Sequence, residues 1–367
     1  NNPIYSLSVE RAACRSMDLS PLKTCKLKVL SLKDCGVNSL NFQPLATSPL
    51  HKLYVINCPL KKIDVSPLKN TLTELWLGTL QNTYFWEEIN HKQTKPKYQL
   101  LDLSKMKKLK RVYACGVASL KTVKLKDTKT KQGIRSLLEL HLYGTGIRTL
   151  DATAAKNLKR LFVGDRIRKL TVDKCKKLKE IGMINLGSKQ AATIKSSSVQ
   201  HIQYQGKTLK NLSFSKCPKL YTLSIKCTKV GTVNLRSNKR LHYMTLNSKK
   251  TGKVVYPKVS TKGWHDCCDL VETNYYKNLD EFKNDPDAKG VYKEYVGYTL
   301  EYPTKILDIS AWTSFNKTVK RCMFGYGDFD HKKCATKKII INKKLRKADK
   351  KWIKKFAKKW HVKVVEK

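Results

Sequence analysis

The sequence predicts an α/β repeat fold, a solenoid with a parallel sheet on its concave side and a mostly irregular or 3₁₀ convex side. The motif L-x-x-L-x-L-x-x-(C/N/T)-x-(I/L/V)-x-x-L recurs, for example as LKVLSLKDCGVNSL from Leu27. Later copies follow one another at steps of 20 or 21 residues, starting at Leu137, Leu158, Leu178, Val199, Leu220 and Leu241. A fixed period in this range indicates one structural unit per copy, stacked on the next.

The L-x-L core of each copy predicts a short strand. Side chains alternate between the two faces of a strand, so both leucines point to the same side. One copy cannot bury them alone, but stacked copies bury them against one another and pair their strands in parallel. Cys35, Cys58 and Thr145 follow the strand, where a side chain is expected to satisfy backbone groups of the bend.

The second half of each copy predicts the convex side. It reads MDLSPL (17–22), IDVSPL (63–68) or LDLSKM (101–106). Asp and Ser favour local turns and Pro cannot join a ladder of strands, so irregular or 3₁₀ structure is expected instead of a long helix. Together these features are typical of a leucine-rich-repeat solenoid.

Two segments carry a resemblance to a known group. KKIDVSPLKNTLTELWL (61–77) and RKLTVDKCKKLKEIGM (168–183) share the cadence of short-repeat leucine-rich proteins of bacterial surfaces, and the pattern resembles the internalin-like and gut-bacterial cell-surface group over residues 4–256. The resemblance implies a secreted or cell-surface protein that acts in binding or adhesion. It names no ligand, and no anchoring motif of that group is matched.

The predicted domains are repeats over 1–256, a Tyr- and acid-rich insertion over 257–303, and a final repeat with a strand–helix–strand cap over 304–367. A smaller insertion covers 79–99. The helix is expected at 348–360, with one apolar face formed by Trp352, Ile353, Phe356 and Trp360. Such a helix can lie on a membrane. The apolar strands expected on both sides of it favour a cap on the open end of the solenoid.

The composition bounds the partners. The net charge is +47, but the lysines crowd the turn segments, which predicts a solvated basic exterior and makes nucleic acid an improbable ligand of the sheet. An anionic glycan or wall polymer on that exterior is the alternative function. No apolar run is long enough for a membrane span. The chain begins at Asn1 without a methionine, so a mature or trimmed fragment is expected. The protein is also expected to be a monomer.

Reading equivalent positions of successive copies as rows locates the candidate site. The fifth position points out of the sheet, and we call its ring-bearing members the aromatic row: Tyr54, Trp76, Tyr113, His141 and Phe162. Tyr143 lies two positions further on and is expected to extend it. Exposed aromatic surface favours binding of a protein or carbohydrate ligand. The alternative is that the rings only stack and stiffen the sheet.

The third position predicts a structural role. We call its members the charged row, because Lys52, Glu74, Arg111, Glu139, Arg160 and Glu180 alternate in sign. Opposite charges on neighbouring strands attract, so this row should hold the strands in register and keep the concave sheet near neutral.

Neither metal, cofactor nor catalysis is expected. WHDCCDL (264–270), which contains His265, suggests zinc together with Cys322, His331 and Cys334, but vicinal cysteines do not match the usual ligand spacing. The acidic run at 280–290 lacks the spacing of a calcium loop. Scattered buried thiols are favoured over a disulfide framework. No catalytic constellation or phosphate loop is visible, so the chain is expected to be non-enzymatic, with an enzyme inside 257–303 as the remaining alternative.

Overall fold

The structure is a computed structural model. It describes residues 4–79, 96–164, 166–185, 194–258, 297–300, 304–315 and 336–367. The chain divides into two compact units. Unit 1 holds the described residues up to 185 together with 194–198, and unit 2 holds those from Val199 onward.

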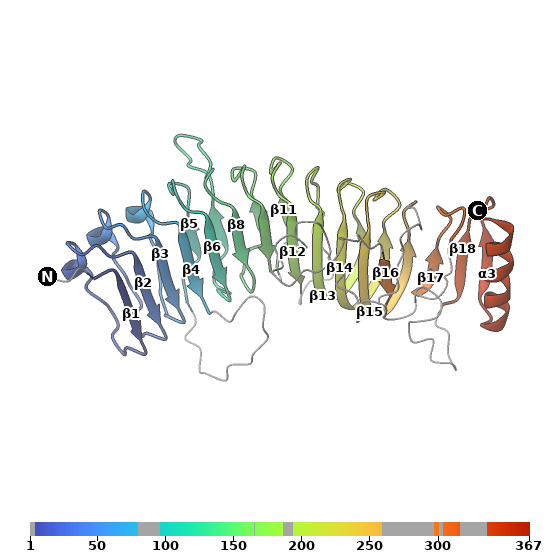
Figure 1. Ribbon diagram of the computed structural model, residues 1–367. Coiled ribbons are helices and arrows are strands. Elements are labelled where there is room, and N and C mark those ends of the chain that lie inside the picture. The colour runs from blue at the N-terminus through green and yellow to red at the C-terminus, as the bar shows by residue number, and fades with distance from the viewer. Residues whose placement is uncertain are drawn as a thin grey trace, which may run out of the picture. The chain divides into compact units, whose positions relative to one another are not determined.

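Unit 1 is built around a parallel sheet, whose neighbouring strands lie side by side in Figure 1. Each strand pairs with the corresponding strand of the next copy, and the connection between them returns along the other side. The strands in order are β1 (Ser6–Glu10), β2 (Val29–Lys33), β3 (Lys52–Ile56), β4 (Glu74–Gly78), β6 (Arg111–Cys115), β8 (Glu139–Leu142), β10 (Arg160–Val163) and β12 (Glu180–Asn185).

The register of these strands confirms the predicted stacking. Leu30 on β2 lies opposite Leu53 on β3, which lies opposite Leu75 on β4, and all three are fully buried. The alternate residues of the same strands face outward. Because each strand keeps the same register as its neighbour, every repeat position forms a continuous row across the sheet.

The early strands end at residues that adopt a left-handed backbone. Asp34 and Asn57 both have φ of 53°, a conformation that Asp and Asn tolerate better than most residues. The thiol of Cys35 then donates to the carbonyl of Lys33 at 3.2 Å, and that of Cys58 to the carbonyl of Ile56 at 3.4 Å. The cysteines therefore satisfy backbone groups of the bend as expected, and both are free thiols.

The side opposite the sheet has the expected 3₁₀ character. It carries η1 (Ser20–Leu22), η2 (Gln43–Leu45) and η3 (Ser66–Leu68), each with a proline in its first turn. Before each of them an Asx side chain accepts a backbone N–H two residues ahead, at 2.9 to 3.0 Å. Further copies use short parallel strand pairs instead: β5 (Leu100–Asp102) with β7 (Thr122–Lys124), and β9 (Thr149–Asp151) with β11 (Lys169–Thr171).

Unit 2 departs from the expectation of short strands. Its parallel sheet begins with three strands of 13 residues each: β13 (His201–Ser213), β14 (Thr222–Asn234) and β15 (Tyr243–Val255). The β14 segment TLSIKCTKVGTVN has neither Asp nor Pro after its leucine core, and it is rich in β-branched residues. Without a left-handed residue to stop it, the strand continues around the bend.

The end of unit 2 is a strand–helix–strand arrangement. β16 (Gly297–Leu300) and β17 (Thr304–Asp308) both pair with β15, and β18 (Lys338–Ile341) lies between β17 and β19 (Lys363–Glu366). Helix α3 (Lys347–Lys359) connects β18 to β19. It buries Ile353 and Ala357, and its Lys350 and Lys354 pair with Glu366 at 2.8 and 3.2 Å.

Two expectations concern segments on which the structure is largely silent. Most of the 79–99 and 257–303 insertions lies outside the described residues, and so do all four cysteines of the conceivable zinc site. Within the described residues, no helix combines the length and the apolar character that a membrane crossing requires.

Candidate functional site

The structure brings the predicted aromatic row together on the outer face of the unit 1 sheet. Its five members lie on adjacent strands, from β3 to β10, in direct register. Successive ring centroids are 5.8 Å apart for Tyr54–Trp76, 3.8 Å for Trp76–Tyr113, 4.4 Å for Tyr113–His141 and 4.5 Å for His141–Phe162. The rings therefore form one continuous stack along the sheet.

Exposure divides this row into two parts. Tyr54, Trp76 and Tyr113 are half-buried, whereas His141 is 5% exposed and Phe162 7% exposed. The expectation of a surface-exposed row is therefore wrong for its last two members, because the neighbouring rings cover them. Tyr143 is half-buried, and its ring lies 5.6 Å from that of Phe162.

A glycine ends the row. Gly182 lies opposite Phe162 on β12, and a Cβ at this position would lie 2.2 Å from Cδ1 of that ring and 2.8 Å from the hydroxyl of Tyr143. The aromatic side chains thus occupy the space above Gly182. The other end is different, since Tyr54 lies opposite Ser31 on β2, whose side chain is too small to cover a ring.

The charged row is confirmed. All six members follow one another in register on β3, β4, β6, β8, β10 and β12: Lys52, Glu74, Arg111, Glu139, Arg160 and Glu180. Nη2 of Arg111 lies 2.6 Å from Oε2 of Glu74, and Nη2 of Arg160 lies 2.7 Å from Oε1 of Glu139. These ion pairs join neighbouring strands, as opposite charges on adjacent strands should.

The two rows interact, which the sequence did not indicate. Glu74 is only 6% exposed, and it accepts hydrogen bonds from Nε1 of Trp76 at 2.6 Å and from Nε and Nη2 of Arg111 at 3.1 and 2.6 Å. Burial opposes the charge of Glu74, but these hydrogen bonds and the positive charge of Arg111 outweigh it and lower its pKa. We call Glu74, Trp76 and Arg111 the Glu74 cluster.

A second cluster repeats this arrangement two strands away. Glu139 accepts hydrogen bonds from Arg160 at 2.7 Å and from the hydroxyl of Tyr113 at 3.3 Å. His141 takes the place that Trp76 has in the Glu74 cluster, two residues after the glutamate. We call Glu139, His141, Tyr113 and Arg160 the Glu139 cluster. Burial, and to a lesser degree the charge of Glu139, raises the pKa of Tyr113 to about 12.

His141 is the exceptional member of the Glu139 cluster. Its Nε2 lies 3.8 Å from Oε2 of Glu139, beyond hydrogen-bond distance, and neither ring nitrogen has a hydrogen-bond partner within the described structure. Burial lowers its pKa to about 4, although the charge of Glu139 acts in the opposite direction. His141 is therefore a neutral, buried imidazole at physiological pH.

A hollow of 370 Å³ is lined by members of both clusters, although not by Trp76. Two of its lining residues, Tyr113 and His141, belong to the predicted site, and the other five come from the charged row: Lys52, Glu74, Arg111, Glu139 and Arg160. The sequence placed these five in a structural role only. Their part in the hollow could have been found by noting that the third and fifth positions of a strand face the same side.

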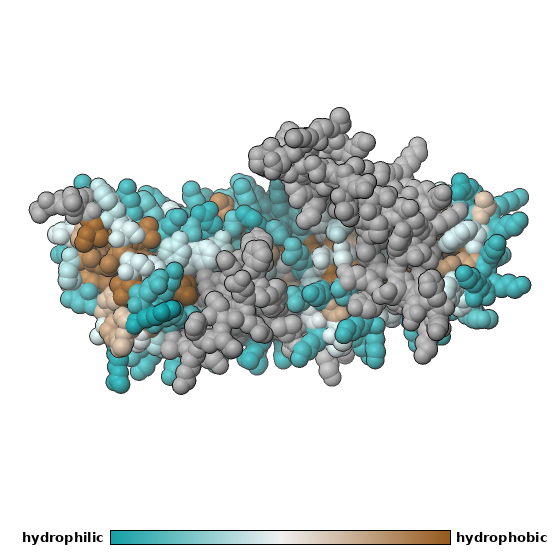
Figure 2. Space-filling model, turned by 60° about the horizontal axis from the view of Figure 1, so that its bottom comes forward, coloured by the Kyte–Doolittle hydropathy of each residue, from teal (hydrophilic) through white to brown (hydrophobic). Residues whose placement is uncertain are grey.

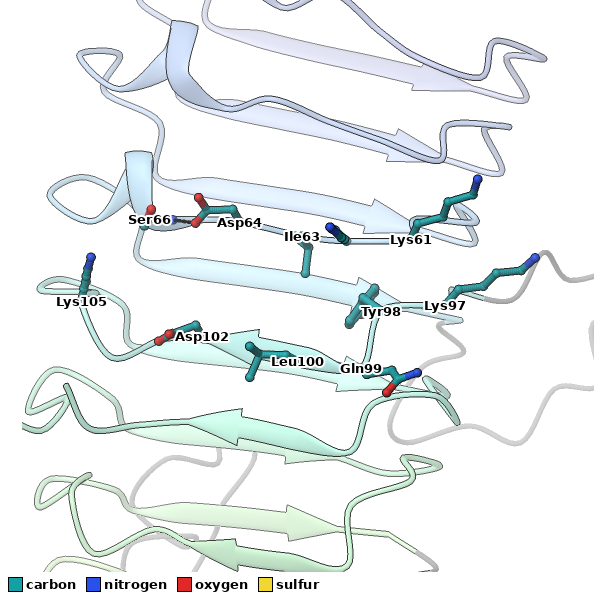
Figure 3. A pocket seen from close by; sticks show the side chains of 11 residues that line it. Lys61, Ile63, Asp64, Ser66, Lys97, Tyr98, Gln99, Leu100, Asp102 and Lys105 are labelled. Carbon is teal, nitrogen blue, oxygen red and sulfur yellow. Dashed lines mark hydrogen bonds between the residues drawn. The ribbon is translucent and has the colours of Figure 1, made fainter. Parts of the chain in front are cut away.

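A second hollow, of 680 Å³, lies between the segments 61–66 and 97–105. Figure 3 shows Ile63 and Leu100 between them, with Lys61 and Lys97 toward one end and Asp64 and Asp102 toward the other. Both carboxylates accept backbone N–H groups of their own turns, from Ser66 and Ser104. They are therefore occupied in holding the local backbone.

Apolar surface also gathers over the N-terminal strands of unit 1 in Figure 2. Ile4 and Tyr5, which precede β1, are 45% and 48% exposed. Among the described residues no group of three or more His, Cys, Asp or Glu side chains is arranged to hold a metal ion.

Comparison with known proteins finds similar solved structures at low identity. No family model matches the sequence, and no curated protein matches it. Similar solved structures include the functional domain of InlJ from Listeria monocytogenes, which includes a cysteine ladder (16% identity, 71% of this chain and 64% of that one, TM-score 0.31). A leucine-rich repeat protein from Bacteroides ovatus is similar at 13% identity, over 75% of this chain and 78% of that one, with a TM-score of 0.22.

A third similar structure is that of TLR13 in its complex with ssRNA13 (14% identity, 95% of this chain and 48% of that one, TM-score 0.42). The chain thus spans less than two thirds of the InlJ domain and about half of TLR13. TM-scores below 0.5 support no inference about the ligand of this protein. The chain's own repeats, their parallel pairing and their register identify the fold as a leucine-rich-repeat solenoid.

Proposed function

We propose that this protein is a non-enzymatic recognition scaffold that binds a protein or glycan ligand through the aromatic row and the adjoining charged row. The observation that carries the proposal is the hollow of 370 Å³ beside the half-buried rings, lined by donors and acceptors that the sheet holds in place. Ligand sites are typically concave, with aromatic walls and a few fixed polar groups.

The burial of the Glu74 carboxylate supports a role for the aromatic row beyond stiffening the sheet. Stacked rings alone would stabilise the sheet without a charge beneath them. Glu74 is instead withdrawn from water on an outward-facing strand, where its hydrogen bonds with Arg111 and Trp76 and the charge of Arg111 outweigh the cost of desolvation. A fixed array of this kind orients the guanidinium of Arg111, whose side chain is 46% exposed, toward a ligand.

The same geometry argues against catalysis at this site. A pair of carboxylates that hydrolyses glycosides needs one member with a raised pKa to act as the acid. The pKa of Glu74 is lowered, and both glutamates are paired with arginines. Binding without chemistry is the function that these residues support. We infer a secreted or cell-surface location as well, because the repeats resemble those of leucine-rich proteins of bacterial surfaces. Protease accessibility on intact cells tests that location.

Trp76→Ala tests the proposal, with Ser224→Ala as the matched control. Ser224 occupies the fifth position on β14 in unit 2, where it is exposed and carries no ring. Glycan and protein arrays are probed with both variants at about 50 and about 200 mM salt. We expect Trp76→Ala to lose at least about tenfold in affinity and Ser224→Ala to bind as the unsubstituted protein does.

Polyanion binding through the basic exterior is the second candidate. It is favoured by Lys229 and Lys250, which are exposed and lie directly opposite each other on β14 and β15, where like charges repel unless an anion intervenes. Binding that is strong only at the lower salt concentration and unchanged by Trp76→Ala would establish this candidate and refute the proposal above.

A further inference from the structure

The charged row alternates in sign along the sheet, but its positive members are the more exposed ones in the hollow of 370 Å³. The side chains of Glu74 and Glu139, which line this hollow, are 8% and 13% exposed. Those of Arg111 and Arg160 are 46% and 45% exposed. A ligand that enters the hollow therefore meets guanidinium groups and little of either carboxylate.

Both arginines keep donors for a ligand. Arg111 directs Nε and Nη2 to Oε2 of Glu74, and Arg160 directs Nη2 to Oε1 of Glu139. Nη1 of each arginine has no hydrogen-bond partner among the residues that the structure describes. Because the glutamates already hold these side chains in position, binding does not have to order them, and such preorganisation favours affinity.

The charge of the hollow indicates an anionic group. Lys52 is exposed and lines the same hollow, so three positive charges face the two negative ones of Glu74 and Glu139, which leaves one positive charge. Glu180, the third acid of the row, does not line the hollow. A carboxylate is planar and accepts two parallel hydrogen bonds from a guanidinium. Its single charge also suits this small excess better than a phosphate group does.

The positions of the two arginines suit a ligand with more than one carboxylate. Arg111 lies on β6 and Arg160 on β10, with β8 between them. Two strand spacings correspond to about 10 Å, which is about the length that three residues of an extended peptide cover. Two acidic side chains a few residues apart in one segment can therefore reach both guanidinium groups.

The direction of the ring stack favours a peptide over a saccharide. Trp76 lies between Tyr54 and Tyr113, with interplanar angles of 27° and 18°, and Tyr113 lies between Trp76 and His141. Neighbouring rings thus take the faces on which a sugar ring would pack, apart from the Ser31 side of Tyr54. The half-buried rings offer their edges, which apolar and aromatic side chains of a protein can contact.

We propose that the ligand of the aromatic and charged rows is an acidic segment of a protein, whose carboxylates bind Arg111 and Arg160 while an apolar side chain contacts the ring edges of Trp76 and Tyr113. This inference rests on the proposed function and adds the chemistry of the ligand and the residues that select it. The net charge of +47 speeds the approach of such a partner. An acidic glycan is the competing outcome.

Selection from a random peptide library displayed on phage tests the inference, at about 150 mM salt to limit contacts with the basic exterior. Selected peptides are synthesised, and their affinities are measured by fluorescence anisotropy for Arg111→Gln, Arg160→Gln and the control Arg148→Gln. Arg148 is an exposed arginine outside both rows, so its loss changes the net charge equally. We expect peptides rich in Asp and Glu that bind the first two variants at least about tenfold more weakly and the control undiminished.

The same contact can be tested without altering the protein. Each arginine variant leaves a nearly buried glutamate with one partner fewer, so its fold is checked by urea denaturation. Replacing Asp and Glu of a selected peptide by Asn and Gln leaves the protein intact, and we expect this change to weaken binding by at least about tenfold as well. An unchanged affinity of the amide peptide would overturn the inference even if an arginine variant failed to fold.

Each other result has a distinct meaning. Acidic peptides that bind both arginine variants as tightly as the unsubstituted protein overturn the inference. So do selected peptides that depend on Trp76 but carry no excess of Asp and Glu, and these leave the proposed function standing. If no peptide is selected and both arginine variants lose binding to polygalacturonate, the ligand is an acidic glycan. The absence of any ligand that Trp76→Ala weakens overturns the inference and the proposed function together.

Discussion

Replacing His141 by phenylalanine should stabilise the protein, although it alters a buried residue. The new ring keeps its place in the stack, where the centroids of Tyr113 and Phe162 lie 4.4 and 4.5 Å away. It removes two nitrogens that have no hydrogen-bond partner within the described structure. Since an unsatisfied buried polar group costs about 1–3 kcal/mol, we expect a gain of about 1 kcal/mol near pH 7.5 after some loss of fit.

The stability that His141→Phe gains over the unsubstituted protein should increase in mild acid. The pKa of His141 is lowered from 6.5 to about 4 in the folded state, first because it is buried. Between these two values the unfolded chain binds a proton that the folded protein does not, so the stability of the unsubstituted protein falls as the pH falls from 6.5 toward 4. At about pH 5 this linkage amounts to about 2 kcal/mol, and His141→Phe lacks it.

Urea denaturation of both proteins at about pH 7.5 and about pH 5 measures this difference. The other titrating groups are common to both proteins, and the charged side chains facing His141 are Glu139 on its own strand, Arg111 on β6 and Arg160 on β10. The pair Glu139→Gln with and without His141→Phe controls for a change in the glutamate. An advantage of His141→Phe that is the same at both pH values would refute the reasoning, as would a loss of stability at neutral pH.

Two further substitutions test the packing at the end of the aromatic row and at helix α3. Gly182→Ala places a Cβ 2.2 Å from the ring of Phe162 and should lower the free energy of unfolding by about 1–3 kcal/mol, seen as a lower melting temperature than that of Ser224→Ala. An unchanged melting temperature would show that the ring moves freely. Asp349→Asn replaces a buried carboxylate, which accepts hydrogen bonds from the N–H of Phe315 at 3.2 Å and from the guanidinium of Arg346 at 2.9 Å, by a neutral amide. We expect it to lower the free energy of unfolding by about 2–3 kcal/mol. Hydrogen exchange at α3 reports it, and unaltered protection there would contradict this role.

The rows were predictable because the repeat period specifies them. Once the L-x-L cores are known to pair in parallel, Tyr54, Trp76 and Tyr113 must be lateral neighbours, and the alternating signs of Glu74 and Arg111 must form ion pairs. The lengths of the strands in unit 2 were less predictable. These lengths depend on the absence of a residue that ends the strand. Asp34, with its left-handed backbone, follows the end of β2, and no residue of β14 adopts that conformation.

The clusters could not be predicted, because they depend on how far each side chain reaches. Trp76 and His141 hold the same repeat position, and the periodicity treats them as equal. Only the packed sheet shows that one reaches its carboxylate and the other does not. The burial of His141 likewise follows from the rings on either side of it.

The solenoid, the inward leucines and the membership of each row follow from the repeat period, because a fixed period makes equivalent positions neighbours whatever their side chains are. Only the packed sheet shows which rings remain accessible, which carboxylates are buried beside them and where the hollow opens. Those properties depend on distances of about an ångström between side chains, and hydrogen bonds are sensitive on that scale.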